Sequence, residues 1–340
     1  MSTGSEKPLI FLDPFPRNEA MVYTPDAAAE LDRLGRVVSH FGSRAPDDMV
    51  EAILPDVEII VGQTAMPRER LDRAPKLKAI LNVKANWEPN IDYAEAHRRG
   101  IHVLSAAPAM APAVAEFCVG QAIALSRGLT QSDRLFRAGN ERYGIQEGRH
   151  HYGLLGTTVG LIGYGNLGRE LAPLLRPFGG EMLVHDPWLS DAYLASEGLV
   201  PRTLPDLLRE ARIIFMLAGV TVENEGFLDR AMLELIQPDA SLVLASRAEV
   251  VDFDALVEMA ASGRIRAAID VYPKEPVAPD DPIRGRDNIL FTAHVAGALE
   301  ASYARIRAAM LDDIAQILKG FQPMRMQRAI PRLAAISCSR

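Results

Sequence analysis

The sequence predicts an α/β fold with two parallel sheets, in which one domain is inserted into a second domain that is split. Three observations predict this fold. Short apolar runs alternate with helix-like segments in two separate series, a glycine-rich turn opens the second series, and a long helical pattern follows each series. At 340 residues the chain is long enough for two domains that each bury a core.

The first series runs from Pro8 to Ser105. Strands are expected at "PLIFLD", "VEIIVG", "LKAILNV" and "IHVLSA", with crossover helices such as "DAAAELDRLG" between them. The segment "AAPAMAP", residues 106–112, breaks this pattern. A long amphipathic helix is then expected from about Ala113 to Gly139.

The second series begins near Thr158, after a polar segment punctuated by glycine. Its expected strands are "TVGLIG", "EMLVHD", "ARIIFMLA", "ASLVLAS", "IRAAIDV" and "NILFTAH". A single helical pattern follows from Ala298 to Lys319. These two long helical patterns suggest that the chain returns to its first domain at the end, although periodicity alone does not decide this arrangement.

The composition favours a soluble cytoplasmic protein. With 37 basic and 44 acidic side chains the net charge is -7, which argues against a nucleic-acid or anionic-membrane partner. No apolar run approaches the roughly 20 residues of a membrane span, and the start "MSTGSEKPLIFLD" lacks a targeting signal. Cys118 and Cys338 lie far apart, so neither a disulfide framework nor a thiolate metal site is expected, and no metal is predicted.

The glycine-rich turn places G-x-G-x-x-G at Gly163, Gly165 and Gly168, directly after an apolar strand and at the start of a helical pattern. The first glycine permits a tight turn, the second lets the backbone approach a pyrophosphate, and the third lets helix and strand pack closely. The amides of Asn166 and Leu167 would face the phosphates. The alternative is a strand–helix turn that binds no ligand.

A carboxylate follows at the end of the next strand. Asp186 in "LVHDPW" lies 18 residues after the last glycine, Gly168, where it would accept hydrogen bonds from a ribose diol. Pro187 and Trp188 come next and offer no cation to a 2′-phosphate, so NAD is favoured over NADP. Alone, Asp186 could equally be an exposed turn residue.

Three further stretches end later strands: "LVLASRAEVVD", "AAIDVYPKEP" and "ILFTAHVAGA". With the glycine-rich turn they make the chain resemble the D-isomer-specific 2-hydroxyacid dehydrogenase family, which includes phosphoglycerate dehydrogenases and hydroxypyruvate or glyoxylate reductases. The resemblance covers nearly the whole chain and is densest from Val159 to Gly297. It implies Rossmann-like and flavodoxin-like domains, with an NAD-binding domain (108–304) inserted into a split substrate domain (1–107 and 305–340).

The resemblance also implies the reaction: an NAD-dependent oxidoreductase that interconverts a 2-keto acid and a D-2-hydroxy acid by hydride transfer, acting as a homodimer. Arg247 would clamp the substrate carboxylate and polarise its carbonyl. His294 would be the acid/base, with Glu275 stabilising its protonated form, and Asp270 would hold the nicotinamide carboxamide. The residues expected at the cofactor are Gly163, Gly165, Asn166, Leu167, Gly168, Asp186, Gly219, Ala245, Arg247, Asp270 and His294.

Each of the three catalytic candidates has a structural alternative. Arg247 could be a surface arginine, although it follows a run of apolar and small residues at a strand end. Glu275 lies in a proline-rich turn where an exposed glutamate is ordinary. His294 could be a buried structural histidine, because it ends an apolar strand.

The chain departs from the family at "KANWEP", where a glycine-rich loop is usual and its backbone amides hold the substrate carboxylate. We expect Lys84 to add a second cation, Asn86 to supply hydrogen bonds and Trp87 to form a wall of the substrate site, with Ala85 between them. The alternative is a solvated Lys84 and a Trp87 that fills the core. "GQTAM", residues 62–66, is the expected opposite wall.

The departures leave the identity of the 2-hydroxy acid and the direction of the reaction open. The main rival function is an NAD(H)-sensing protein, similar to the transcriptional co-repressors that resemble this family and act through protein partners. Retention of Arg247, Glu275 and His294 weighs against that alternative.

Overall fold

The computed structural model describes residues 7–337. The described residues do not include Cys338 or residues 1–6. Residues 1–6 form the start of the segment in which a targeting signal was sought. The chain divides into two compact units. Unit 1 comprises Met1–Met110, Thr221–Glu223 and Ala298–Arg340, and unit 2 comprises Ala111–Val220 and Asn224–Gly297. The domain bounds expected from the sequence, 1–107 with 305–340 and 108–304, stay a prediction.

Unit 1 contains a sheet in the order β13-β5-β4-β3-β1-β2. Its strands are β1 (Leu9–Asp13), β2 (Arg36–Ser39), β3 (Val57–Gly62), β4 (Ala79–Asn82), β5 (His102–Ser105) and β13 (Gln327–Arg328). All are parallel except β13, which pairs antiparallel with β5. The order 2-1-3-4-5 is flavodoxin-like, and it reverses direction between β1 and β3.

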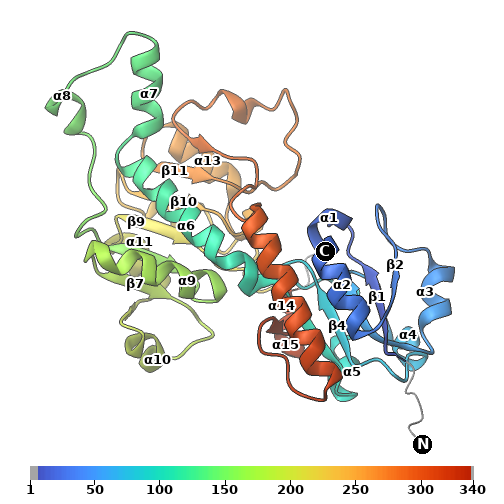
Figure 1. Ribbon diagram of the computed structural model, residues 1–340. Coiled ribbons are helices and arrows are strands. Elements are labelled where there is room, and N and C mark those ends of the chain that lie inside the picture. The colour runs from blue at the N-terminus through green and yellow to red at the C-terminus, as the bar shows by residue number, and fades with distance from the viewer. Residues whose placement is uncertain (1–6, 338–340) are drawn as a thin grey trace, which may run out of the picture. The chain divides into compact units, whose positions relative to one another are not determined.

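Helices cover both faces of this sheet. They are α1 (Glu19–Val22), α2 (Pro25–Leu34), α3 (Asp47–Ile53), α4 (Arg68–Asp72), α5 (Tyr93–Arg98), α14 (Glu300–Leu318) and α15 (Pro331–Ser337). Met310 and Ile314 of α14 are buried in one cluster with Ile10 and Ile59 of the sheet. Helix α14 lies beside α1 and α2 (Figure 1), so α14 completes the core of unit 1.

Unit 2 contains a parallel sheet in the order β12-β11-β10-β9-β6-β7-β8. Its strands are β6 (Val159–Ile162), β7 (Met182–His185), β8 (Val200–Pro201), β9 (Ile213–Met216), β10 (Ser241–Leu244), β11 (Arg266–Ile269) and β12 (Leu290–Phe291). The chain runs outward from β6 in one direction and then outward from β9 in the other, which is the Rossmann order. The predicted fold class is confirmed.

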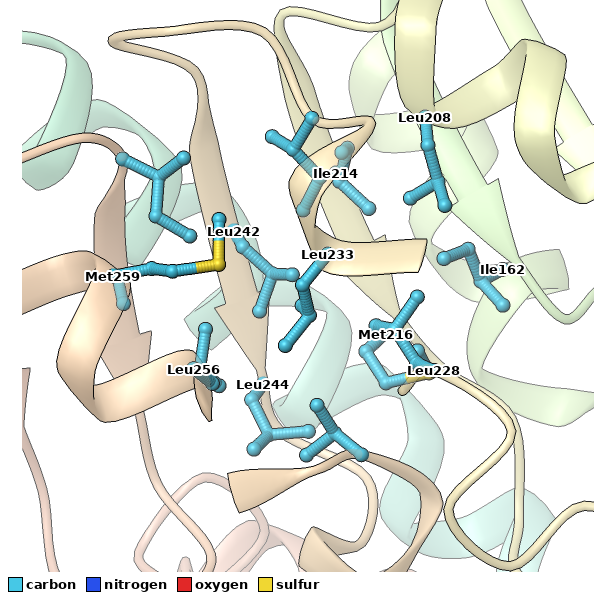
Figure 2. Packing of buried hydrophobic residues seen from close by; sticks show 14 of the residues in the cluster. Ile162, Leu208, Ile214, Met216, Leu228, Leu233, Leu242, Leu244, Leu256 and Met259 are labelled. Carbon is cyan, nitrogen blue, oxygen red and sulfur yellow. The ribbon is translucent and has the colours of Figure 1, made fainter. Parts of the chain in front are cut away.

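Helices pack on both faces of the second sheet as well. They are α6 (Ala107–Ser126), α9 (Asn166–Leu175), α10 (Asp191–Ser196), α11 (Leu204–Glu210), α12 (Arg230–Glu234) and α13 (Phe253–Ala261), of which α6 begins in unit 1. Helices α7 (Leu129–Arg137) and α8 (Ile145–Gly148) also belong to unit 2 but bury no residue. Figure 2 shows one face, where Leu233 of α12 and Leu256 of α13 pack with Leu242 and Leu244 of β10. This burial of both sheet faces explains the continuous apolar runs in the sequence.

The expected break at residues 106–112 was wrong. Helix α6 begins at Ala107 and includes Pro112. Pro108 fits because the first turn of a helix needs no donor there, and Pro112 removes only one intrahelical hydrogen bond. The helix also ends earlier than expected, because Gly128 adopts a left-handed conformation (φ 60°) before α7 begins.

Helix α6 is, by length and composition, the one described helix that could cross a membrane, although no apolar run of that length was expected. About half of its apolar window, 56%, is buried inside the protein. Val114, Cys118 and Ala122 lie in the core of unit 2. A core helix passes the same test of length and apolarity, so packing in the core accounts for the composition of α6.

Candidate active site

The chemistry-bearing residues of unit 2 gather at one edge of its sheet. Gly163, Asp186, Arg247, Asp270 and His294 follow β6, β7, β10, β11 and β12 respectively. Because these strands are all parallel, their carboxyl ends meet at the same edge, which is where ligands bind in such sheets.

His294 and Glu275 form a hydrogen-bonded pair. The imidazole Nδ1 lies 2.7 Å from the Glu275 carboxylate, and both side chains are part-exposed. His294 has a left-handed backbone (φ 52°), which is uncommon for a residue other than glycine. The surrounding hydrogen bonds must therefore hold this conformation.

The buried carboxylate of Asp270 supplies those bonds. Its Oδ1 accepts from the Thr292 hydroxyl at 2.6 Å and from Val295 N at 3.0 Å, and its Oδ2 accepts from Ala296 N at 3.1 Å. The backbone carbonyl of Asp270 also accepts from His294 N at 2.8 Å. One side chain, 1% exposed, thus anchors the loop on both sides of His294. We name residues 292–296 the catalytic loop.

Tyr272 ties the same loop to Glu275. Its hydroxyl donates to the carbonyl of Thr292 at 2.7 Å, and its backbone N donates to Glu275 Oε1 at 3.0 Å. Burial, with the nearby charges of Asp270 and Glu275, raises the pKa of Tyr272 to about 12. The hydroxyl therefore stays protonated at neutral pH and remains a donor.

Arg247 lies at the end of β10 and is part-buried. It donates to the carbonyl of Ser246 at 2.6 Å. Burial lowers the pKa of Arg247, and the carboxylates of Glu249 and Glu275 oppose that shift. Glu275 thus interacts with Arg247 as well as with His294, which brings the three catalytic candidates together electrostatically.

The glycine-rich turn fits a dinucleotide phosphate. Gly163 has φ 97°, and a Cβ added there would lie 2.9 Å from Ala218 N, so only glycine allows this close approach. At Gly165 an added Cβ would meet no atom of the described chain within 4 Å, which leaves open space above the backbone. Helix α9 begins at Asn166, so the amides of its first turn border that space.

Asp186 is oriented by two backbone amides. Its carboxylate accepts from Tyr164 N at 2.7 Å and from Trp188 N at 2.9 Å. These bonds hold it at the end of β7, beside the glycine-rich turn, where a ribose diol would be bound. Gly219 and Ala245 lie after β9 and β10 at the same edge.

In unit 1, the segment from Lys84 to Glu88, which we name the substrate loop, follows β4. Lys84 Nζ forms an ion pair with Glu88, and Glu88 also pairs with Arg44 at 3.2 Å. Trp87 is 8% exposed, lies in a hydrophobic cluster of unit 1 and makes an edge-to-face contact with Tyr93. The packing agrees with the alternative in which Trp87 fills the core, and Lys84 is paired within its own loop.

Comparisons with known proteins agree with this geometry. A family model described as "D-isomer specific 2-hydroxyacid dehydrogenase, NAD binding domain" matches residues 119–296. The chain belongs to the D-isomer-specific 2-hydroxyacid dehydrogenase family. This confirms the resemblance that the motifs indicated, and the matched domain makes NAD the cofactor.

Three relatives illustrate the breadth of the family. The D-3-phosphoglycerate dehydrogenase of Archaeoglobus fulgidus is 30% identical over 287 residues, which are 82% of this chain and 53% of that one. The glyoxylate reductase of Thermofilum pendens is 30% identical over 264 residues, 75% of this chain and 76% of that one. A crystal structure of a phosphoglycerate oxidoreductase from Rhizobium etli is 35% identical, with a TM-score of 0.84 over 95% of this chain and 99% of that one. The chain thus spans about half the length of the Archaeoglobus relative.

Some residues that hold the catalytic loop and the substrate loop were missed from the sequence. Thr292 and Tyr272 were not expected to hold the catalytic loop, and Asn82, at the end of β4, was not singled out. The available signal for Asn82 was weak: a polar side chain at the end of an otherwise apolar strand. The sequence expectation for Asp270 concerned the cofactor, whereas its carboxylate also binds the loop that carries His294.

Proposed function

We propose that the protein interconverts a 2-keto acid and a D-2-hydroxy acid with NAD, using His294 and Glu275 as the acid/base pair and Arg247 as the substrate clamp. The observation that carries the proposal is the 2.7 Å pair between His294 and Glu275, on a loop that Asp270 anchors. Family membership supports the oxidoreductase class and a small 2-keto or 2-hydroxy acid as the substrate class.

The protein must move one proton for each hydride. NADH, when bound, supplies the hydride to the carbonyl carbon of the keto acid. His294 holds Nδ1 against Glu275, which leaves Nε2 as the nitrogen that gives a proton to the carbonyl oxygen. The Glu275 carboxylate stabilises the protonated imidazole before the transfer. In the direction of oxidation the same nitrogen takes the proton back.

Arg247 orients the substrate. A guanidinium can bind a carboxylate through two parallel hydrogen bonds, and it can polarise the adjacent carbonyl group. Because Arg247 is part-buried, water competes less for its N–H groups, which strengthens both interactions.

The cofactor is held by residues at the same edge of unit 2. The glycine-rich turn with the amides of Asn166 and Leu167 receives the pyrophosphate, and Asp186 receives the adenosine ribose. The two oxygens of Asp270 retain lone pairs after accepting three hydrogen bonds, so this carboxylate can also accept from the nicotinamide carboxamide. Gly219 and Ala245 complete the proposed contact set.

A homodimer in the cytoplasm is part of the proposal. Helix α7 and the segment after it expose several large apolar side chains of unit 2: Leu129, Phe136, Tyr143, Ile145 and Leu155. Such a group of exposed apolar residues is typical of a surface that another chain covers. Light scattering of the purified protein tests this proposal, and a monomer at micromolar concentration would contradict it.

The reaction is tested by NADH oxidation with a panel of 2-keto acids. The names of the relatives direct the first choices, glyoxylate and hydroxypyruvate, and simple 2-keto acids extend the panel. We expect turnover with at least one acid and a D-configured product. Tight NADH binding without turnover on any acid would favour the rival function, an NAD(H)-sensing binding protein.

A further inference from the structure

The side chain of Asn82 forms hydrogen bonds with the backbone of the substrate loop. It is 2% exposed, at the carboxyl end of β4. Its Oδ1 accepts from Lys84 N at 2.7 Å, and its Nδ2 donates to the carbonyl of Asn86 at 2.8 Å. One amide group therefore bridges the start and the middle of the loop, as a backbone turn would do.

Gln63 locks Asn82 in this orientation. Gln63 follows β3, is 2% exposed, and donates from Nε2 to Asn82 Oδ1. Asn82 cannot be flipped, because its oxygen receives two N–H groups and its nitrogen faces a carbonyl. Gln63 cannot be flipped either, because its oxygen would then face the oxygen of Asn82. Its Oε1 is buried without a partner in the described chain, so the bond to Asn82 alone sets this orientation.

Further contacts hold the remainder of the loop. The Tyr93 hydroxyl donates to the carbonyl of Glu88 at 2.7 Å and accepts from Glu88 N at 3.2 Å. The side chain of Asn90 donates to the carbonyl of Gln63 at 2.9 Å. The amide of Ala85, in the middle of the loop, donates to no group in the described part of the chain. The loop is thus fixed at both ends and offers an unused backbone donor at its centre.

We propose that Asn82 and Gln63 are positioning residues that hold the substrate loop so that the Ala85 amide binds the carboxylate of the 2-keto acid. The proposal rests on the proposed function for the identity of the ligand. The paired amides lie at the carboxyl edge of the unit 1 sheet, where they join the loops that follow the neighbouring strands β3 and β4. In a glycine-rich loop, the freedom of the backbone lets the chain adopt the conformation that presents its amides. This chain has no glycine between Gly62 and Gly100, so the side chains of Asn82 and Gln63 set the conformation of the loop instead.

Two isosteric variants test the amide pair. Asn82→Asp keeps the oxygen that receives Lys84 N but places an acceptor against the carbonyl of Asn86. We expect KM for the keto acid to rise about tenfold, the equivalent of about 1.4 kcal/mol, with kcat and the Kd for NADH within about twofold of wild type.

Gln63→Glu adds a signature in pH that a general loss of stability would not produce. While it is protonated, the introduced carboxylic acid can still donate to Asn82, whereas its ionised form presents an oxygen to an oxygen. We expect the ratio of the variant's KM to that of wild type to be near one at low pH and to rise as the acid ionises. Burial shifts that ionisation above the usual range for glutamate.

A matched control and a second readout separate this proposal from the proposed function. Asn288→Asp makes the same change at an asparagine of unit 2 that donates to backbone carbonyls of α13, and it should leave KM unchanged. In a Trp188→Phe background the remaining tryptophan, Trp87, reports on the loop without turnover. Asn82→Asp, and Gln63→Glu at high pH, should shift its emission to the red.

The outcomes are distinct. If wild type reduces no 2-keto acid, the proposed function fails, and a shift of Trp87 emission in both variants still supports the positioning of the loop. If both variants keep wild-type KM and wild-type emission across the pH range, the positioning role is overturned. A fall in kcat with unchanged KM would also overturn it, because the loop would then act on the chemical step.

Discussion

The catalytic loop of unit 2 and the substrate loop of unit 1 are each held by one buried side chain, which is a carboxylate in unit 2 and an amide in unit 1. In each unit, a buried side chain at the end of one strand bonds to the backbone of an adjacent loop. Asp270 is a carboxylate and accepts only, so it gathers N–H and O–H donors around His294. Asn82 is an amide that accepts and donates, so it bridges two points of its own loop.

The difference indicates that the two loops serve different steps, catalysis in unit 2 and substrate binding in unit 1. The charged anchor makes stronger hydrogen bonds and supports a left-handed histidine, whose position must be accurate for the proposed proton transfer. The neutral anchor costs less to bury and leaves the loop uncharged except for Lys84 and Glu88, which pair with each other. Changes around Asp270 should therefore lower kcat, whereas changes around Asn82 should raise KM.

Among the variants that retain His294, the largest effect should come from Arg247→Lys, which keeps the charge but loses the planar fork of donors. We expect kcat/KM to fall about a hundredfold or more, because a bidentate clamp cannot be replaced by an ammonium group. Steady-state kinetics with the best keto acid measures the loss. Arg264→Lys, at an arginine of unit 2 that donates to backbone carbonyls, is the control and should retain activity.

Asp270→Asn should give the next largest effect. The asparagine oxygen can serve Thr292 and Val295, but its NH2 group then opposes the N–H of Ala296, and a buried unsatisfied donor costs about 1–3 kcal/mol. We expect kcat to fall about tenfold to a hundredfold while KM changes little. Asp281→Asn, at a carboxylate that accepts from Ile283 N, is the matched control. A rise in KM with unchanged kcat would break the proposed division.

Lys84→Ala should have a smaller effect, confined to KM. If Lys84 serves the substrate as a second cation, its removal raises KM roughly threefold to tenfold. Lys76→Ala, which breaks a more exposed pair with Asp56 in the same unit, should change nothing. An unchanged KM in Lys84→Ala would show that Lys84 pairs with Glu88 and does not bind the substrate.

The smallest effect concerns Asp13, a buried carboxylate at the end of β1. Burial raises the pKa of Asp13 despite hydrogen bonds from Thr64 and Ala45. A raised pKa means that the folded state binds the proton more tightly than the unfolded state. The free energy of unfolding therefore falls as pH rises from the ordinary pKa of aspartate through the raised value.

Asp13→Asn should remove this contribution, since an amide does not titrate, while keeping an acceptor for Ala45 N. Urea denaturation of wild type and variant at several pH values measures the difference, and the variant should gain relative stability towards neutral pH. Parallel pH dependence in the two proteins would show that Asp13 does not titrate differently on folding.

Most strands could be predicted because each is buried on both faces and appears as a continuous apolar run, as in Val159–Ile162. Strand β2 was missed because Arg36–Ser39 is an edge strand with no fully buried residue. The expected break before α6 failed because Pro108 and Pro112 are tolerated where the helix begins.

Some residues of the candidate site could likewise be predicted from the sequence, whereas others could not. Gly163 stands in a motif whose spacing carries its chemistry, and Arg247, Glu275 and His294 stand in local motifs that resemble those of the family, so the sequence was sufficient to nominate them. The anchors could not be nominated. The backbone amides that donate to a buried carboxylate depend on the conformation of a loop that is distant in sequence. The residues next to His294 in the sequence do not indicate its left-handed backbone.

The most direct test of the account is NADH oxidation by wild type and by His294→Gln with the same panel of 2-keto acids. Glutamine keeps a polar side chain but cannot donate a proton as imidazolium does. We expect turnover by wild type and a loss of about a hundredfold to ten-thousandfold in kcat for the variant, with NADH binding retained. Equal rates for the two proteins would contradict the assignment of His294 as the acid/base.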